Sequence, residues 1–256
     1  MILAIDIGNT NIVIGGIDNQ KTHFIERLST DRKKTELEYA ISFKTIMELY
    51  QIHPHNIEGG IIASVVPPLS NIIKKAMEKL IDKPILIIGP GVKTGLNILT
   101  DNPGQLGSDL VINAVAAIHE YQKPLIVIDM GTATTISAID KAGNYLGTCI
   151  IPGVEVSMNS LTSQTSQLPA ISIEAPKRVI GRNTIECMKS GAVFGNAALL
   201  DGMIDRIQNE LGPEPATVIA TGGLSGSIVP YCTHSIIYDD DLLLKGLLIV
   251  YNKNKK

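Results

Sequence analysis

The first residues whose types suggest chemistry follow an apolar run at the start of the chain. Met1 to Ile5 reads as a buried strand, and "DIGNTN", Asp6 to Asn11, then supplies a carboxylate, a glycine and small polar side chains. The same residue types also form ordinary turns, so the motif alone has two interpretations. A phosphate-binding site needs this composition, because backbone N–H groups, Thr and Asn donors and metal-binding carboxylates must all approach the ligand closely.

The same pattern occurs a second time in the middle of the chain. Residues 125–135 read "LIVIDMGTATT", again an apolar strand followed by Asp-x-Gly and small hydroxylated residues. We interpret the repetition as a duplication that places a carboxylate and a polar turn from each of two related domains at a shared cleft. A shift of 123 positions aligns Asp6 with Asp129, Gly8 with Gly131, Asn9 with Thr132, Asn11 with Thr134 and Val13 with Ile136.

A third strand, "VIATGG" from Val218 to Gly223, ends in two glycines. Gly222 and Gly223 could serve only a strand-to-helix turn, which is a common use of glycine. Together with the other two motifs, they offer backbone that a nucleotide can approach, because no Cβ intervenes. We therefore predict an ATP site with "DIGNTN" at one edge, where Asp6 and Asp129 act on phosphate through a metal ion or water. The motifs match neither a Walker A loop nor a dinucleotide-binding glycine turn.

Composition places the chain among globular proteins. It has 256 residues, 45% of them hydrophobic and 18% charged, and its net charge of −3 gives no general attraction to nucleic acid or anionic lipid. Cys149, Cys187 and Cys232 are far apart, so we expect buried, reduced thiols. The N-terminus does not resemble a signal peptide and no apolar run approaches the roughly 20 residues of a membrane span, so we predict a soluble, cytoplasmic protein.

Strands and helices alternate along the chain, which indicates an α/β architecture with parallel strand pairs. The segment 31–52 has apolar residues at helical spacing, namely Leu37, Ile41, Ile46 and Leu49. Residues 95–109 form a long polar loop of the kind that is often functional, and a helix is predicted from Leu110 to His119. The predicted strands of the first half lie at 2–5, 12–17, 23–28, 59–68 and 83–91, and a helix is predicted after Pro68. The second half repeats the plan with strands at 125–140, 143–153 and 217–223 and helices at about 184–211 and from Leu242.

Seven short motifs in order resemble the type III pantothenate kinase family over essentially the whole chain. They are "DIGNTN", "NP" at Asn102, "GSD" at Gly107, "DMGTATT", "PG" at Pro152, "GRNT" at Gly181 and "ATGG". The resemblance implies a duplicated actin-like (ribonuclease H-like) α/β fold, with domains at 1–121 and 122–256 and an ATP cleft between them. It also implies a homodimer that phosphorylates pantothenate, using ATP, Mg²⁺ and a monovalent cation (K⁺ or NH₄⁺), in the first step of coenzyme A synthesis.

The resemblance also assigns roles to individual residues. Asp129 corresponds to the family's potassium ligand and Asp109 to its general base. The ATP-binding residues expected from the motifs are Asp6, Ile7, Gly8, Asn9, Thr10, Asn11, Ile12, Val13, Gly131, Thr132, Gly222 and Gly223. The expected acceptor-binding residues are Thr100, Gly107, Ser108, Asp109, Leu110 and Thr184, the last near the dimer interface.

Asp109 has two chemically sound interpretations. A carboxylate in hydrogen-bond reach of a primary hydroxyl can orient it and accept its proton during phosphoryl transfer. An aspartate placed just before the predicted helix at Leu110 can also cap that helix. One side chain could do both.

The chain departs from the family pattern around the acceptor. Leu110 stands where the family has an arginine, and Thr100 where a tyrosine is usual. Gln164 and Gln167 occupy positions that are basic in the family. Pantothenate is an anion, so these losses predict weaker electrostatic recognition of the acceptor.

Three functions are therefore compared. The leading one is a pantothenate kinase whose acceptor site uses different residues. The second is a related small-molecule kinase with another hydroxyl acceptor, and the third is a non-catalytic nucleotide-binding regulatory protein. Retention of Asp109 argues against the third.

Overall fold

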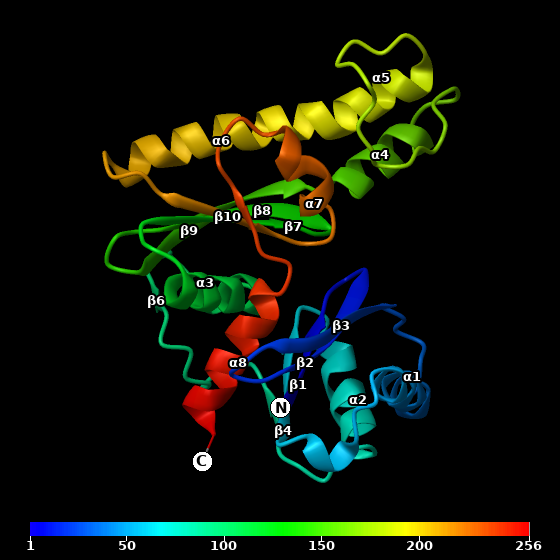
Figure 1. Cartoon of the computed structure of the whole chain (residues 1–256), viewed down its shortest axis with the longest axis vertical. Helices are drawn as coiled ribbons and strands as arrows, with labels where there is room; N and C mark the ends of the chain where they lie inside the picture. The colour runs from blue at the N-terminus through cyan, green and yellow to red at the C-terminus, as the bar shows by residue number, and fades with distance from the viewer. Residues whose placement is uncertain (256) are drawn as a thin grey trace. The chain divides into compact units, whose positions relative to one another are not determined.

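The computed structural model describes residues 1–255, which form two compact units (Figure 1). Unit 1 comprises Met1–Gly95, Gly104–Ala116 and residues 241–255, and unit 2 comprises Leu96–Pro103 and Ala117–Asp240. The closing segment of the chain thus groups with the first unit. The domain boundary at 121/122 remains a prediction.

Unit 1 is built on a five-stranded sheet in the order β3-β2-β1-β4-β5. Its central strand β1 is buried along nearly its whole length, runs antiparallel to β2 and runs parallel to β4. A parallel neighbour and burial on both faces explain why this segment reads as a continuous apolar run. The strands are β1 (Ile2–Ile7), β2 (Asn11–Ile17), β3 (Thr22–Ser29), β4 (Gly59–Ser64) and β5 (Ile85–Ile87).

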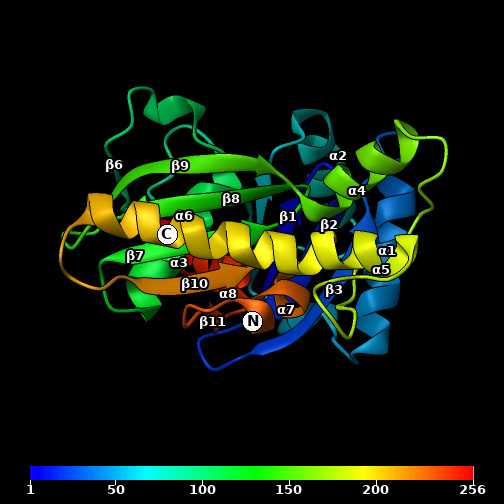
Figure 2. The ribbon, with the colours of Figure 1, turned by 90° about the horizontal axis from the view of Figure 1, so that it is seen from above.

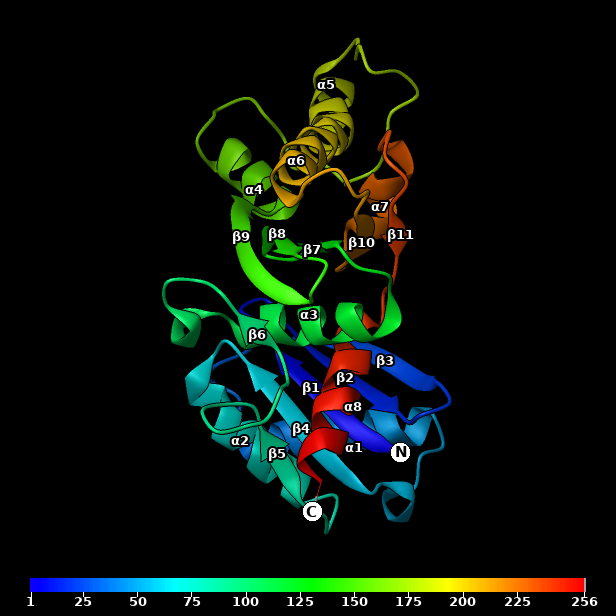
Figure 3. The same ribbon diagram turned by 90° about the vertical axis from the view of Figure 1, so that its left-hand side faces the viewer.

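Helices cover both faces of this sheet. The helices are α1 (Glu36–Leu49), α2 (Pro67–Glu78), α3 (Ser108–Glu120, of which 108–116 belong to unit 1) and α8 (Leu242–Asn254). Side chains of α1 and α2 share one core cluster with β1 and β2. On the other face α8 packs so closely that a Cβ at Gly15 would overlap the Leu244 side chain, and Figure 3 shows α8 crossing these strands.

Helix α1 confirms the predicted helix but buries another face. Leu37, Ile41 and Leu49 are each more than half exposed, and of the four predicted apolar positions only Ile46 is buried. The buried face carries the rings of Tyr39 and Phe43, because aromatic rings remove more apolar area from water than the aliphatic residues opposite them. The helix also begins later than the predicted segment, at a capping box formed by Thr35 and Glu38.

Unit 2 has a six-stranded sheet in the order β11-β10-β7-β8-β9-β6. Its strands are β6 (Asn97–Ile98), β7 (Leu125–Met130), β8 (Ala133–Ile139), β9 (Asn144–Pro152), β10 (Thr217–Thr221) and β11 (Ile237–Tyr238). Its helices are α4 (Val154–Ser163), α5 (Thr184–Ser190), α6 (Asn196–Leu211) and α7 (Ser225–Ile228), and a π-helical segment at Gly191–Gly195 joins α5 to α6. Figure 2 shows α6 lying along this sheet, where it completes the second core.

The two sheets confirm the predicted duplication. The order β3-β2-β1-β4-β5 repeats as β9-β8-β7-β10-β11, with β6 added at one edge. The 123-residue shift is wrong beyond the turn, however. Asp6 pairs with Val13, whereas Asp129 pairs with Thr135, so the second turn is one residue shorter and the shift becomes 122. The pairs Asn11/Thr134 and Val13/Ile136 are therefore not equivalent, and Ile17–Asp18 instead matches Ile139–Asp140.

Three further expectations need correction. The prolines after β4 occupy the first turn of α2, where their missing N–H groups cost nothing. Helix α3 begins at Ser108, two residues earlier than predicted. Cys187 is exposed, whereas Cys149 and Cys232 are partly buried, and burial raises the pKa of the Cys232 thiol to about 11. Helices α4 and α7 were not predicted. Within residues 1–255, no helix is both long and apolar enough to cross a membrane.

Candidate active site

The β1–β2 turn of unit 1 presents exposed polar side chains on a fixed backbone. Asp6 is the penultimate residue of β1, and Asn9, Thr10 and Asn11 are exposed around the turn. The Gly8 N–H donates to the Asn11 carbonyl at 3.0 Å, and the Thr30 hydroxyl donates to the Gly8 carbonyl at 2.7 Å. The Thr30 N–H also donates to the Thr10 carbonyl. Thr30 directly follows β3, far from the motif in sequence, so motif spacing had not identified it.

The turn that carries Asp109 is tied to the same edge of the unit 1 sheet. The Ser64 N–H donates to the Ser108 hydroxyl at 3.2 Å, which holds the start of α3 at the end of β4. Ser64 pairs with Ile7, the neighbour of Asp6. The structure thus brings the first phosphate motif and the Gly107–Asp109 turn to one edge of the sheet.

Asp109 is the second residue of α3, not its cap. Its carboxylate forms no hydrogen bond or ion pair with the rest of the described chain. A Cβ on Gly107 would lie 2.4 Å from its Oδ1, so the carboxylate folds back over this glycine. A side chain at position 107 would push this carboxylate aside, and the carboxylate remains available to a ligand.

The other predicted acceptor residues are divided between the two units. Leu110 is only 9% exposed and belongs to unit 1. Thr100 belongs to unit 2, and its buried hydroxyl has no hydrogen-bond partner among the described residues. Thr184 begins α5 and is exposed, and Gln164 and Gln167 are exposed around the loop that leads to it.

The β7–β8 turn of unit 2 is the counterpart of the β1–β2 turn. Asp129 again lies next to the end of its strand, and Gly131 and Thr132 are exposed. The Gly153 N–H donates to the Thr132 carbonyl at 3.1 Å, and a Cβ on Gly153 would lie 2.4 Å from the carbonyl oxygens of Gly131 and Thr132. This contact gives the "PG" motif a physical reason, because only glycine fits against the turn.

The third glycine motif packs against Asp129. Gly222 has φ +95°, and a Cβ there would lie 2.6 Å from the Met130 nitrogen and 2.7 Å from Asp129 Oδ1. A structural role is therefore sufficient to explain Gly222. At Gly223 an added Cβ would meet no atom within 4 Å. Of the two glycines, Gly223 is the one with open space beside it.

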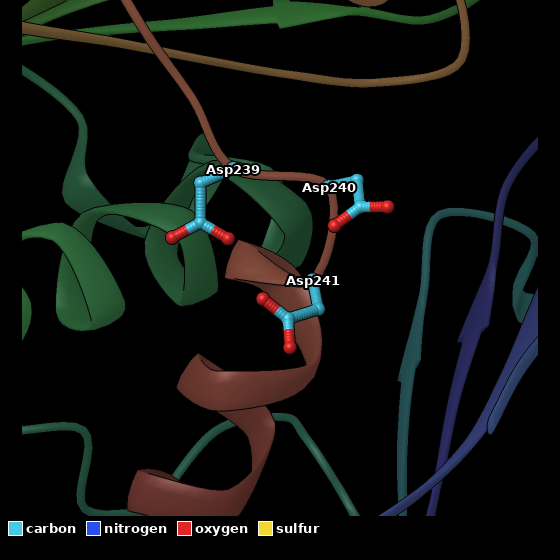
Figure 4. A group of neighbouring side chains, drawn as sticks. All are labelled: Asp239, Asp240 and Asp241. Atoms are coloured by element: carbon cyan, nitrogen blue, oxygen red, sulfur yellow. The ribbon is translucent and has the colours of Figure 1, made fainter. Parts of the chain in front are cut away.

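A run of three aspartates lies where the chain passes from unit 2 back to unit 1 (Figure 4). Within unit 2, Asp239 accepts a hydrogen bond from the Tyr121 hydroxyl at 2.6 Å. Within unit 1, Asp241 accepts from the Thr22 hydroxyl at 2.5 Å and pairs with Lys245 at 2.6 Å. These partners give Asp239 and Asp241 structural roles.

Comparisons with known proteins identify both the fold and the family. Residues 2–206 match the family model described as Type III pantothenate kinase. A type III pantothenate kinase from Brevibacillus brevis is 43% identical over 255 residues, which covers all of both chains. Among solved structures, MreB 5 of Spiroplasma citri bound to AMPPNP gives a TM-score of 0.56 at 9% identity and covers 99% of this chain and 96% of its own.

A second solved structure gives a similar result. The activator of the 2-hydroxyisocaproyl-CoA dehydratase from Clostridium difficile, with bound ADPNP, has a TM-score of 0.52 at 14% identity and covers 97% of this chain and 92% of its own. At such identities the likeness shows the fold alone. The predicted duplicated actin-like α/β fold is confirmed.

Proposed function

The chain belongs to the type III pantothenate kinase family, and on this basis we propose how its own residues carry out the reaction. The family transfers the γ-phosphoryl group of ATP, with a divalent metal, to the primary hydroxyl of pantothenate in coenzyme A synthesis. We propose that Asp109 is the general base. The observation that supports this role best is its carboxylate, which is held over Gly107 and forms no hydrogen bond or ion pair within the described chain.

Proton transfer from the acceptor gives Asp109 its role. As the γ-phosphoryl group transfers, the attacking hydroxyl becomes strongly acidic, and a carboxylate in hydrogen-bond reach orients it and accepts the proton. The bond from Ser64 to Ser108 fixes the start of α3 and thereby the backbone of Asp109. Gly107 and Ser108 therefore act as positioning residues.

The two Asp-x-Gly turns are proposed to hold the phosphates. In unit 1, residues 6–13 offer the exposed side chains of Asn9, Thr10 and Asn11 on a turn that Thr30 holds in place. In unit 2, Gly131 and Thr132 offer a second exposed turn, and Gly222 and Gly223 a third stretch of backbone without Cβ atoms. This donor set fits ATP, since phosphate is held by N–H and hydroxyl donors and by a divalent metal that neutralises its charge.

Asp129 is proposed to ligate a monovalent cation. Its carboxylate lies close to the backbone of Gly222, and the carbonyl oxygens of Gly131 and Thr132 lie in the same turn region. Carboxylate and carbonyl oxygens are the ligands that K⁺ prefers.

The proposed cation site is tested by changing the salt. Activity should be high in KCl or NH₄Cl and low in NaCl of equal ionic strength, because a site sized for the larger ions dehydrates Na⁺ at a net cost. Equal initial rates in the three salts would remove this role from Asp129.

A homodimer in the cytoplasm completes the proposal. Apolar side chains are exposed on and near α4 and α5 of unit 2, namely Val156, Leu161, Val179, Ile180 and Ile185. Clustered exposed apolar residues are typical of an interface, and isologous dimers are the commonest assemblies. Sedimentation equilibrium tests this part directly, because a monomeric mass at micromolar concentration would contradict it.

One assay compares the proposed acceptor with its alternatives. The purified chain is incubated with ATP, Mg²⁺ and K⁺ and a panel of hydroxyl-bearing metabolites that includes pantothenate, and products are identified by mass spectrometry. Phosphopantothenate as the main product supports the proposal. Phosphorylation of another compound alone would identify a kinase with a different acceptor, and no product at all would identify a non-catalytic nucleotide-binding protein.

A further inference from the structure

The phosphate-binding turn proposed for unit 1 has no positive charge of its own. From Met1 to Gln20, a stretch that includes the whole motif 6–13, the sequence contains no lysine or arginine. A triphosphate carries several negative charges, and charge-assisted hydrogen bonds from a cationic side chain stabilise it more than neutral donors do. A cationic side chain for this turn can therefore come only from another segment of the chain.

The strand register of the unit 1 sheet places an arginine beside the turn. Asp6 of β1 pairs with Val13 of β2, and Val13 pairs in turn with Arg27 of β3. Directly paired residues project from the same face of a sheet, so these three side chains form one row. Neighbouring strands are about 4.8 Å apart, so the Cα atoms of Asp6 and Arg27 are separated by about 10 Å.

This row lies on the face of the sheet opposite α1 and α2. Ile12, which precedes Val13, belongs to the core cluster that these helices share with the sheet, and Leu28, which follows Arg27, packs against it. Successive side chains along a strand alternate between faces, so the row projects from the other face. Helix α8 packs on that face next to the row, at Gly15, whereas Arg27 is exposed.

Arg27 is also a diagonal neighbour of Asn11, one of the exposed side chains proposed to bind phosphate. Arg27 pairs with Val13, and Asn11 lies two residues before Val13 on the same strand. Diagonal neighbours on one face of an antiparallel pair are about 7 to 8 Å apart, which is within reach of a long side chain. An arginine at this place can therefore contact an anion that Asn11 also binds.

The guanidinium of Arg27 has no partner among residues 1–255. It forms no hydrogen bond or ion pair there, and the adjacent carboxylate of Glu26 accepts instead from the Tyr50 hydroxyl. The backbone of Arg27, by contrast, is fixed within the eight-residue strand β3. A guanidinium on a fixed backbone loses less conformational freedom on binding than one on a mobile loop.

The next cations along the chain, Arg32, Lys33 and Lys34, follow a segment that is bound to α1. The Asp31 N–H donates to the Tyr39 hydroxyl oxygen at 3.1 Å, and the Tyr39 hydroxyl donates to the Asp31 carbonyl at 2.7 Å. Tyr39 is a buried residue of the core on the α1 face. The chain has therefore turned to the other side of the sheet before these cations, and Arg27 is the one that shares a face with Asp6.

We propose that Arg27 binds the phosphates of ATP from the β3 side of the first turn and neutralises part of their charge. A planar guanidinium can form two parallel charge-assisted hydrogen bonds with phosphate oxygens. The row thus combines a cation that binds phosphate directly with a carboxylate, Asp6, that acts through a metal ion or water. This inference rests on the proposed function, because it takes residues 6–13 as part of an ATP site.

The test measures nucleotide binding separately from turnover. Titration calorimetry with AMPPNP and Mg²⁺ gives the Kd of the wild type and of Arg27→Gln, and steady-state kinetics give the KM for ATP and for pantothenate. Arg27→Gln should raise the Kd for AMPPNP and the KM for ATP about 10- to 100-fold, the range for hydrogen bonds to charged groups. The KM for pantothenate and the urea concentration at the unfolding midpoint should stay close to the wild-type values, because no hydrogen bond or ion pair within the protein is lost. Arg27→Lys should restore part of the affinity, because it keeps the charge but not the fork geometry.

Arg32→Gln is the matched control, since it removes an exposed arginine without an ion pair from the same unit. Its Kd for AMPPNP should equal that of the wild type. An unchanged Kd in Arg27→Gln, or equal increases in both KM values together with a loss of stability, would overturn the proposal. An equal loss of affinity in Arg32→Gln would overturn the assignment to Arg27.

The failure of this inference can be distinguished from the failure of the proposed function. A wild type that does not bind AMPPNP would refute the proposed ATP site and, with it, the role of Arg27. Because AMPPNP binding is measured without an acceptor, a wrong assignment of pantothenate as the acceptor cannot change the result.

Discussion

The two Asp-x-Gly turns occupy equivalent places in the duplicated fold, but they are held by different means. In unit 1 hydrogen bonds from Thr30 hold the turn, because its hydroxyl donates to the Gly8 carbonyl and its N–H to the Thr10 carbonyl. In unit 2 backbone packs on backbone, with Gly153 against the turn and Gly222 against the end of β7. A side-chain hydrogen bond can be replaced at a modest cost, whereas backbone packing excludes every residue but glycine. The second turn should therefore tolerate less change than the first.

The last helix of each copy also begins with an aspartate that is held differently. By strand order, α3 comes after β5 as α8 comes after β11, and an aspartate lies near the start of each helix. Asp241 is bound by Thr22 and Lys245, whereas the Asp109 carboxylate has no partner within the described chain. An aspartate near the start of the helix thus serves structure in one copy and, we propose, catalysis in the other.

The largest effect is expected at Asp109. Asp109→Asn keeps the size of the side chain but cannot accept a proton, so kcat should fall by about 10² to 10⁴. The free energy of unfolding should change by less than about 0.5 kcal/mol, because no contact is lost. Steady-state kinetics and urea unfolding measure both quantities.

Asp241→Asn is the matched control for that experiment. It weakens the bonds from Thr22 and Lys245 and should cost about 1 to 2 kcal/mol of stability while kcat changes little. A large loss of stability in Asp109→Asn with nearly normal turnover would assign Asp109 a structural role like that of Asp241.

Substitutions of the two glycines after β10 distinguish a role in packing from a role in nucleotide binding. Gly222→Ala places a Cβ at positive φ and in overlap with the backbone of Met130, so it should cost about 3 kcal/mol or more in the free energy of unfolding. Gly8→Ala in the first turn meets only the Asn11 carbonyl, at 2.9 Å, and should cost about 1 kcal/mol. Equal losses in urea unfolding would show that the two turns tolerate change equally.

Gly223→Ala adds a Cβ that meets no atom of the protein within 4 Å. Its stability should stay within about 0.5 kcal/mol of the wild type, while its KM for ATP should rise if the nucleotide passes this backbone. An unchanged KM for ATP would remove Gly223 from the proposed site.

Thr30→Val tests how the first turn is held. The substitution keeps the shape and removes the hydroxyl, so the loss of one hydrogen bond should cost about 1 kcal/mol. The KM for ATP should rise several-fold because the turn loses its fixed position, and kcat should change less. Isothermal titration with a non-hydrolysable ATP analogue measures the nucleotide affinity directly. Unchanged affinity would show that the turn does not need this bond.

The smallest effect on stability is expected at the β2–β3 turn of unit 1 and the β8–β9 turn of unit 2. Asp18 and Asp140 occupy equivalent places in these two turns. The hydrogen bond from His23 and the N–H of Gln20 lower the pKa of Asp18 to about 2. Its stabilising effect is therefore present above the ordinary pKa near 3.8 and is lost as the pH falls through about 2. Because the pair is near the surface, Asp18→Asn should cost only about 0.5 to 1 kcal/mol at neutral pH, and the difference from the wild type should vanish near pH 2.

Asp140 has a lowered pKa for a different reason from Asp18. Burial raises its pKa, but hydrogen bonds from Asn144 outweigh burial and lower it overall. The partners of Asp140 are neutral, so the loss of unfolding free energy in Asp140→Asn should not depend on salt. The loss in Asp18→Asn should shrink in 0.5 M NaCl, which is about 3 times the physiological ionic strength. The same salt dependence for both variants would contradict these causes.

Much of this architecture could be predicted from the sequence because it rests on local pattern. The strands before Asp6 and Asp129, the duplication and the helix from Leu242 each follow from apolar runs bounded by turn residues. The one-residue difference between the turns could not be read in this way, because small polar residues fill both turns and hide the gap. Only the ladder partners of Asp6 and Asp129 reveal it.

Residues that act over long sequence distances were missed for a related reason. Thr30 holds a turn 22 residues away, and the need for glycine at Gly153 arises from a turn on another strand. The exposed side of α1 was misread because that helix has two apolar stripes, and only packing on the sheet selects between them. The Asp109 assignment came from the family resemblance, and the geometry of Gly107 now adds a physical argument to it.

Helix α8 has a consequence for synthesis of the chain on the ribosome. It packs on the unit 1 sheet, where Leu244 fills the space beside Gly15 and Gly246 lies against the backbone of Ile112. The strands of unit 1 that emerge first must therefore wait for α8 before that face is covered, whereas residues 117–240 of unit 2 emerge without interruption. Unit 2 can complete its core first, and the nascent unit 1 must hold an apolar sheet face in water until α8 follows. Chaperones should accordingly bind the nascent unit 1 until α8 has emerged from the ribosome.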